Sequence, residues 1–203
     1  MMKSFLVVLL VTLLAATTTS ARAGDQEIKL LLAKPFVKAE FTKVRKLKIL
    51  SRPFMTSGKI LFQEDKGLVW QTLKPIDDTL LIGFSGVSQL KKDSSVPAKI
   101  DNPIVKSASV VFITILSLDL EKIKKIFEIT KNVESKDVKR YTLIPKDATL
   151  KKVIKHIELS GKQRVETIYI EELSGDSTTV TLNNEIFDKS VLLSSEIQLL
   201  ELM

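Results

Sequence analysis

The feature that most constrains the fold of this chain is a repeated alternation of apolar and polar residues that begins at residue 36. Successive side chains of an extended strand point to opposite faces, so such alternation predicts strands with one buried face. The longest stretch, residues 36–50, has five apolar residues on one face: Val37, Ala39, Phe41, Leu47 and Ile49. Lys43 and Arg45 interrupt that face. We expect this long strand to curve around a core.

Shorter alternating segments follow the first one in two groups. The first group comprises residues 59–63, 68–73, 80–84 and 87–90, with a hairpin turn indicated at Asp65-Lys66-Gly67. The second group comprises residues 127–132, 139–144, 153–159, 164–173 and 178–182. The whole pattern predicts a mostly β (α+β) domain, a single curved antiparallel sheet of about ten strands with a helical insert in the middle.

Helical patterns are confined to short segments. Residues 25–33, 120–126 and 196–202 have the spacing of short helices, and Asp147 is placed to cap a helical turn. Residues 104–116 are apolar almost all round, which as a helix indicates a buried segment or one that covers an apolar surface. Their Val and Ile content keeps a strand as the alternative.

The first 23 residues have the three parts of a secretory signal peptide. Lys3 is the positive residue, Phe5 to Ala16 form an apolar run, and Ala21-Arg22-Ala23 is a small-residue cleavage site. The apolar run is short of the ~20 residues that a membrane anchor requires. We therefore expect an exported domain of residues 24–203 that is soluble after cleavage, stabilised by burial because the chain has no cysteine.

The charge of the exported chain is moderately positive. Removal of Lys3 and Arg22 leaves 29 basic residues against 24 acidic ones, spread along the chain. This excess favours contact with anionic lipid or with acidic protein surfaces. An exported protein does not normally meet nucleic acid, so nucleic acid is not an expected partner.

Residue patterns typical of enzymes and metal sites are missing from the sequence. There is no glycine-rich phosphate loop, no nucleophile elbow and no cysteine, and we interpret the single histidine, His156, as structural or surface-exposed. The acid pairs Asp77-Asp78 and Glu171-Glu172 are expected to be solvated charges. The sequence therefore predicts no catalysis, no metal and no cofactor.

Large apolar residues are predicted to converge where the curved sheet meets its helices: Phe41, Leu47, Ile49, Ile60, Phe62, Trp70, Ile82, Val111, Phe112 and Ile115. One interpretation is an ordinary hydrophobic core. The other is a half-closed sheet that holds a lipid chain, with each buried methylene contributing ~0.8 kcal/mol. Composition does not separate the two.

Several segments in order resemble one known family. They are Leu50-Ser51-Arg52-Pro53-Phe54, Ser57-Gly58-Lys59-Ile60-Leu61-Phe62, Gly67-Leu68-Val69-Trp70-Gln71-Thr72, Leu143-Ile144-Pro145 and Ile157-Glu158-Leu159-Ser160-Gly161. Their order and spacing are similar to those of the outer-membrane lipoprotein carrier proteins of Gram-negative bacteria (LolA-like), in the branch with Leu-Ser-Arg-Pro and Gly-Leu-x-Trp-x-Thr segments. The resemblance covers most of residues 24–203.

This resemblance implies a half-open β-barrel, lidded by short helices, whose apolar cavity takes acyl chains. The implied function is that of a monomeric periplasmic carrier with no catalytic activity. It would receive an acylated lipoprotein or lipid from an inner-membrane transporter and pass it to an outer-membrane acceptor. The cavity residues expected on this basis are Phe41, Leu47, Ile49, Phe62, Trp70, Ile82, Val111, Phe112 and Ile115.

The chain departs from the family at the latch of the lid. Family members have an arginine just before the Trp-bearing strand, whereas this chain has Gln63-Glu64-Asp65-Lys66-Gly67 there. Arg45 or Arg52 is the candidate replacement. The resemblance implies a cargo that is either a lipoprotein or, in this branch, a glycolipid or polyene-type lipid. The alternative function is a periplasmic sensor of lipoproteins with the same fold, acting through a membrane-bound partner, and a hydrolase is a third hypothesis.

Overall fold

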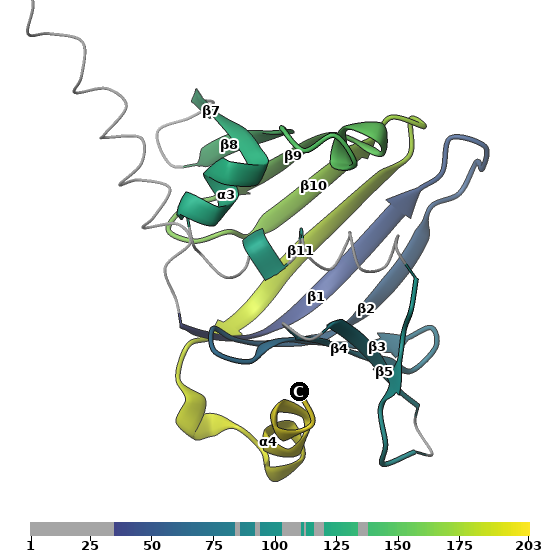
Figure 1. The fold of residues 1–203 in the computed structure, drawn as a ribbon, viewed down its shortest axis with the longest axis vertical. Helices are drawn as coiled ribbons and strands as arrows, with labels where there is room; N and C mark the ends of the chain where they lie inside the picture. The colour runs from purple at the N-terminus through teal and green to yellow at the C-terminus, as the bar shows by residue number, and fades with distance from the viewer. Residues whose placement is uncertain are drawn as a thin grey trace, which may run out of the picture.

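The described residues form eleven strands of one antiparallel sheet, in which strands consecutive in sequence are paired except the sixth and seventh, and the first strand pairs with the last (Figure 1). The structure is a computed structural model that describes residues 35–83, 86–91, 94–102, 111, 113–115, 120–133 and 138–203, with only the backbone of 131–133. The strands are β1 (Phe36–Lys46), β2 (Phe54–Gln63), β3 (Gly67–Lys74), β4 (Asp78–Gly83), β5 (Gly86–Leu90), β6 (Ala98–Lys99), β7 (Phe127–Val133), β8 (Lys139–Pro145), β9 (Ile154–Gly161), β10 (Thr167–Glu172) and β11 (Ser177–Ile186). Strands β6 and β7 are the two edges.

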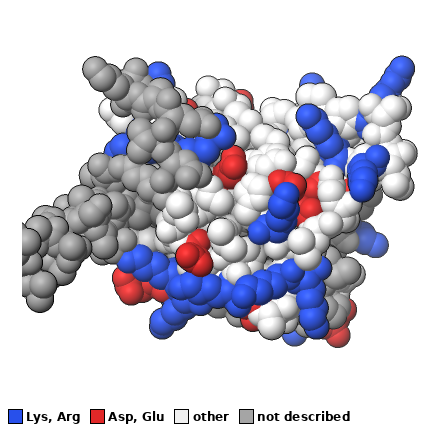
Figure 2. All heavy atoms as spheres, turned by 90° about the horizontal axis from the view of Figure 1, so that it is seen from above, with Lys and Arg blue, Asp and Glu red and all other residues white. Residues whose placement is uncertain are grey.

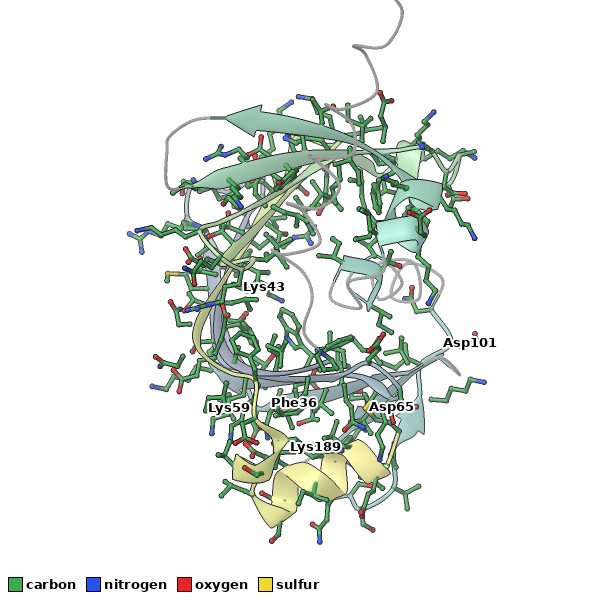
Figure 3. All side chains as sticks on the ribbon, turned by 90° about the vertical axis from the view of Figure 1, so that its left-hand side faces the viewer. Phe36, Lys43, Lys59, Asp65, Asp101 and Lys189 are labelled. Carbon is green, nitrogen blue, oxygen red and sulfur yellow. The ribbon has the colours of Figure 1, made fainter. Side chains whose placement is uncertain are left out.

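The sheet is strongly curled and remains open between its edges. In Figure 3 the sheet describes a C that is open on one side. The short helix α3 (Leu120–Ile126) lies at the open side of the C, and α4 (Ser194–Glu201) lies against the outside. The predicted mostly β, half-open barrel is therefore confirmed.

Alternation along the strands assigns each residue to the inner or the outer face. In β1, Val37, Ala39 and Phe41 belong to the cluster of buried residues on the inner face, whereas Phe36 belongs to the cluster under α4. In β2, Ile60 faces inward and Leu61 faces outward in the same way. Because the period of side-chain direction in a strand is two, one hydrophobic run supplies both clusters.

Close strand approach depends on Gly58 in β2. A Cβ atom at this position would lie 1.9 Å from the backbone oxygen of Gln71 in β3. The register between β2 and β3 also shifts between Ser57 and Gly58. Glycine is thus required here because any side chain would separate the two strands.

Most predicted elements are present, several with revised ends. The predicted helix 120–126 coincides with α3. The Asp147 carboxylate accepts hydrogen bonds from the backbone N–H groups of Thr149 and Leu150, at the start of a 3-10 turn at Leu150–Lys152. The predicted helix 196–202 is α4, two residues earlier at its start. Residues 25–33 lie outside the described residues, as do most of 104–116. Within the latter range, residues 111 and 113–115 are helical.

The predicted first strand was too long. β1 ends at Lys46, and the chain turns back at once, with the N–H of Leu50 donating to the carbonyl of Leu47. The alternation through Leu47 and Ile49 continues the strand pattern, but Pro53 and the antiparallel pairing of β1 with β2 require a turn in this stretch. The side chain of Ile49 is consequently 88% exposed.

Candidate ligand-binding face

The inner face of the curled sheet brings together most of the residues predicted to line a cavity. Six of them belong to one cluster of buried apolar residues: Phe41, Phe62, Trp70, Ile82, Val111 and Ile115. Phe41 and Trp70 are in ring contact, with centroids 4.2 Å apart and planes inclined at 38°. Phe112 lies outside the described residues. That these residues contact an acyl chain stays a prediction.

Leu47 and Ile49 are placed differently. Both follow the end of β1, in the turn that leads to β2. Leu47 is half-buried there, and Ile49 is among the most exposed large apolar residues. Ile49 therefore lies outside the apolar wall, because β1 ends at Lys46, three residues before it.

Two rows of apolar residues cross the first half of the sheet. Val37, Phe62, Leu68, Ile82 and Val87 are successive cross-strand partners from β1 to β5. Ala39, Ile60, Trp70 and Leu80 form the next row. Directly opposed side chains in a sheet lie close enough to pack, so the rows form a continuous apolar wall.

The wall becomes polar toward the end of the curl where β1 and β2 are joined. Lys43 follows Phe41 on the same face and is half-buried, pointing to the inner side of the sheet (Figure 3). Its Nζ lies 6.0 Å from the centre of the Trp70 ring. Burial lowers the pKa of Lys43, the nearby Arg45 lowers it further, and Asp78 raises it. The sequence showed Lys43 only as an interruption of the apolar face.

Thr56 is the cross-strand partner of Lys43 on β2, so the two side chains share one face. The Thr56 hydroxyl oxygen is buried and has no hydrogen-bond partner among the described residues. An unpaired buried hydroxyl is costly, and each one in a native fold requires an explanation. Sequence reasoning missed it because a threonine in a strand has no distinguishing pattern.

The two candidate latch residues lie at the same end. Arg45 forms ion pairs with Glu172 at 3.0 Å and with Asp176 at 3.8 Å, which tie β1 to β10 and to the turn before β11. Arg52 lies exposed in the turn between β1 and β2. A latching role for either arginine stays a prediction.

His156 lies on the outer face of β9, away from the apolar wall. Its Nδ1 is 3.4 Å from Glu171 and its Nε2 is 3.5 Å from Glu158. Glu171 also pairs with Lys155 at 2.8 Å, and Glu158 pairs with Arg140 at 3.1 Å. His156 thus lies between two ion pairs on the outer face, Lys155–Glu171 and Arg140–Glu158.

A hollow of about 200 Å³ also lies on the outer face, over β1, β2 and β3. Glu40, Lys59 and Asn183 are among the residues that line it, together with Phe41 and Leu73. Within the described part of the chain, no three metal-ligating side chains are grouped and no helix has the length and hydrophobicity of a membrane span.

Comparisons with known protein families and with curated proteins give no match to this chain. Among solved structures it is similar to a LolA superfamily protein from Nitrosomonas europaea, at a TM-score of 0.49 and 9% identity over 85% of this chain and 99% of that one. A domain described as an outer membrane lipoprotein-sorting protein from Vibrio parahaemolyticus gives a TM-score of 0.41 and 12% identity, over 87% and 95% of the chains. A chain of the MucA/MucB complex from Pseudomonas aeruginosa gives 0.43 and 11%, over 86% and 62%.

Proposed function

We propose that this protein is a periplasmic carrier, exported by the signal peptide of residues 1–23, whose domain of residues 24–203 shields the acyl chains of a lipoprotein or lipid. The observation that carries the proposal is the continuous apolar wall on the inner face of an unclosed sheet. An acyl chain crossing an aqueous compartment is exposed to water along its length, and each buried methylene contributes about 0.8 kcal/mol. An apolar wall of this kind can bury an acyl chain, and such binding requires no chemical reaction.

The open curl supports uptake and release. Strands β6 and β7 are edges of the sheet, and α3 lies at the open side between them (Figure 3). A carrier must exchange its cargo with a donor and an acceptor, here an inner-membrane transporter and an outer-membrane acceptor. Cargo that binds the open arrangement better than the closed one shifts the protein toward the open arrangement.

Trp70 allows a direct test because it is the only tryptophan of the chain and lies in the apolar wall. The full exported chain is titrated with a fatty acid brominated near the middle of its chain, and tryptophan fluorescence is recorded. Bromine quenches on contact, so a bound acyl chain lowers the emission to a plateau, whereas the unbrominated fatty acid does not. A parallel extraction of protein purified from the periplasm of its host identifies the natural cargo by mass spectrometry.

A matched variant controls for non-specific quenching. Glu replacing Ile82 places a carboxylate in the wall, and Glu replacing the exposed Ile197 of α4 is the control on the outer face. We expect quenching to be lost in Ile82→Glu and retained in Ile197→Glu. Absence of quenching in the wild type, together with protein free of acylated species, would show that the wall is an ordinary core.

A further inference from the structure

Two lysines of β1 lie in similar surroundings but differ in their partners. Lys38 is half-buried on the outer face, and its Nζ is 2.8 Å from the carboxylate of Glu196. Lys43 is half-buried on the inner face, and no carboxylate of the described residues forms an ion pair with it. The Asp78 carboxylate acts on this ammonium without forming an ion pair, and the effect of burial exceeds it. An anion bound beside Lys43 would offset the cost of that burial.

The Thr56 hydroxyl stands next to this ammonium in the register of β1 and β2. It is a donor and an acceptor, and it lacks a partner among the described residues. The nearby Arg45 is already engaged by Glu172 and Asp176, so its charge is balanced by the sheet itself. Lys43 and Thr56 are therefore two neighbouring polar groups of the inner face that are available to a ligand.

Resting on the proposed carrier function, we infer that Lys43 and Thr56 bind the anionic head group of the cargo, a phosphate or a carboxylate, while its acyl chain lies on the wall around Trp70. The arrangement along β1 fits an amphiphile. Phe41 and Ala39 continue the wall on one side of Lys43, and Arg45 with its ion pairs lies on the other. The cargo class is thus an anionic single- or multi-chain lipid rather than a neutral one.

The test compares probes that share one chain and differ in the head group. Hexadecyl phosphate, palmitate and hexadecanol compete with a bound fluorescent fatty-acyl probe on the full exported chain. A hydrogen-bonded charge pair is worth about tenfold in affinity, so we expect both anions to exceed hexadecanol by at least about that factor. A preference for hexadecyl phosphate over palmitate identifies a phosphate site, and the reverse preference identifies a carboxylate site.

Two variants assign the preference to these residues. Lys43→Gln should remove it and leave hexadecanol binding unchanged, and Thr56→Val should reduce it. Lys59→Gln is the control, because Lys59 is a half-buried lysine of β2 that faces outward. Equal affinity for all three probes in the wild type, or a preference that survives in Lys43→Gln, would overturn the inference while the carrier function stands. Absence of binding by every probe would instead contradict the carrier function.

A second observation concerns the end of the curl where three turns meet. The N–H of Lys48, in the β1–β2 turn, donates to Asp176 in the β10–β11 turn, and the N–H of Leu173 donates to the carbonyl of Val153. Residues 46–55, 146–153 and 173–176 therefore form one continuous edge, here called the basic rim. Six of its large apolar residues are exposed: Ile49, Leu50, Phe54, Met55, Val153 and Leu173.

The charges of the basic rim are strongly unequal. Its exposed cations are Lys46, Lys48, Arg52, Lys146, Lys151 and Lys152. Its two acids, Asp147 and Asp176, accept backbone hydrogen bonds that hold their turns. Figure 2 shows basic side chains standing among uncharged ones at the right-hand end of the molecule, where the β1–β2 turn lies in Figure 1.

We propose that the basic rim docks on the anionic surface of a membrane. Apolar side chains at the tips of turns insert into the lipid interface, and lysines beside them extend to the head groups. Each cation near an anionic bilayer raises affinity by roughly fivefold. Because the apolar residues project from separate turns and from the start of β2, they fit a deformable lipid surface better than a preformed protein groove.

Vesicle co-sedimentation tests the docking. The full exported chain should sediment with phosphatidylcholine vesicles that contain phosphatidylglycerol, and not with pure phosphatidylcholine. The double variant Ile49→Glu/Phe54→Glu should lose most of this binding. Leu193→Glu is the control, since Leu193 is as exposed as Phe54 but precedes α4 on the outer face. Failure of the wild type to bind anionic vesicles, or an equal loss of vesicle binding in Leu193→Glu, would overturn the proposal. Binding to a purified membrane protein but not to vesicles would also overturn it and would assign the basic rim to a protein partner.

Discussion

The inner and outer faces of the sheet each contain a cluster of buried apolar residues, but the two clusters differ in the partners of the polar groups beside them. On the outer face, α4 covers a small apolar cluster and is held by the Lys38–Glu196 ion pair. Lys66 adds a hydrogen bond to the carbonyl of Leu200. On the inner face, Lys43 and Thr56 have no such partners among the described residues. The difference concerns these groups alone, because the buried Gln63 Oε1 on the outer face also has no hydrogen-bond partner among the described residues.

The largest expected effect comes from adjacent residues of β2 that face opposite ways. Ile60 is fully buried on the inner face, and Leu61 is 3% exposed on the outer face. Truncation of either to alanine should lower the free energy of unfolding by about 2–5 kcal/mol, measured by urea denaturation. Under conditions where both variants are folded, only Ile60→Ala should change quenching of Trp70 by a brominated acyl chain. Equal changes in both variants would show that the two faces do not differ in function.

A smaller effect is expected when the cover on the outer face loses its charge. Glu196 is buried, accepts a hydrogen bond from Lys38 at 2.8 Å, and accepts one from the N–H of Leu193 at the start of α4. Glu196→Gln leaves the Lys38 ammonium without its counter-charge. We expect a loss of about 1–3 kcal/mol in the free energy of unfolding, with acyl binding unchanged. A variant as stable as the wild type would mean that α4 is held by its apolar contacts alone.

The same residue predicts how stability depends on pH. Burial favours a higher pKa for Glu196, but the hydrogen bonds from Lys38 and from the N–H of Leu193 outweigh it and leave the pKa below its ordinary value. A carboxyl whose pKa is lower in the folded state stabilises the fold at neutral pH, and this contribution disappears as pH falls through the lowered pKa. The difference in melting temperature between wild type and Glu196→Gln should therefore shrink on acidification. A difference that is constant with pH would contradict this assignment.

The smallest effect is expected at the exposed ion pairs of the outer face. Lys155 and Glu171 are 2.8 Å apart, and their hydrogen bond raises the pKa of Lys155 and lowers that of Glu171. Exposed pairs of this kind contribute little because solvent screens them. Lys155→Ala should leave both the urea midpoint and acyl binding unchanged. A clear loss of binding would connect the ion pairs around His156 to the inner face.

The sequence predicted those elements whose ends depend only on residues close by in the chain. The spacing of Leu120, Ile123 and Ile126 predicted α3 with its observed bounds, and Asp147 caps its turn as expected. Strand alternation assigned Phe41, Phe62, Trp70 and Ile82 to one face because side-chain direction in a strand has period two. The class of fold followed from the number and spacing of such strands.

Only the tertiary structure decided where strands end and which polar groups meet. Ile49 continued the alternation of β1, yet the pairing with β2 turned the chain before it, since antiparallel strands need a connection that no periodicity reveals. Lys43 and Thr56 are 13 positions apart in the sequence and become neighbours through cross-strand register. Periodicity therefore determined which face of the sheet each residue occupies. The register between strands determined which residues become neighbours on that face, and the sequence did not reveal it because register depends on the turns and packing of the whole sheet.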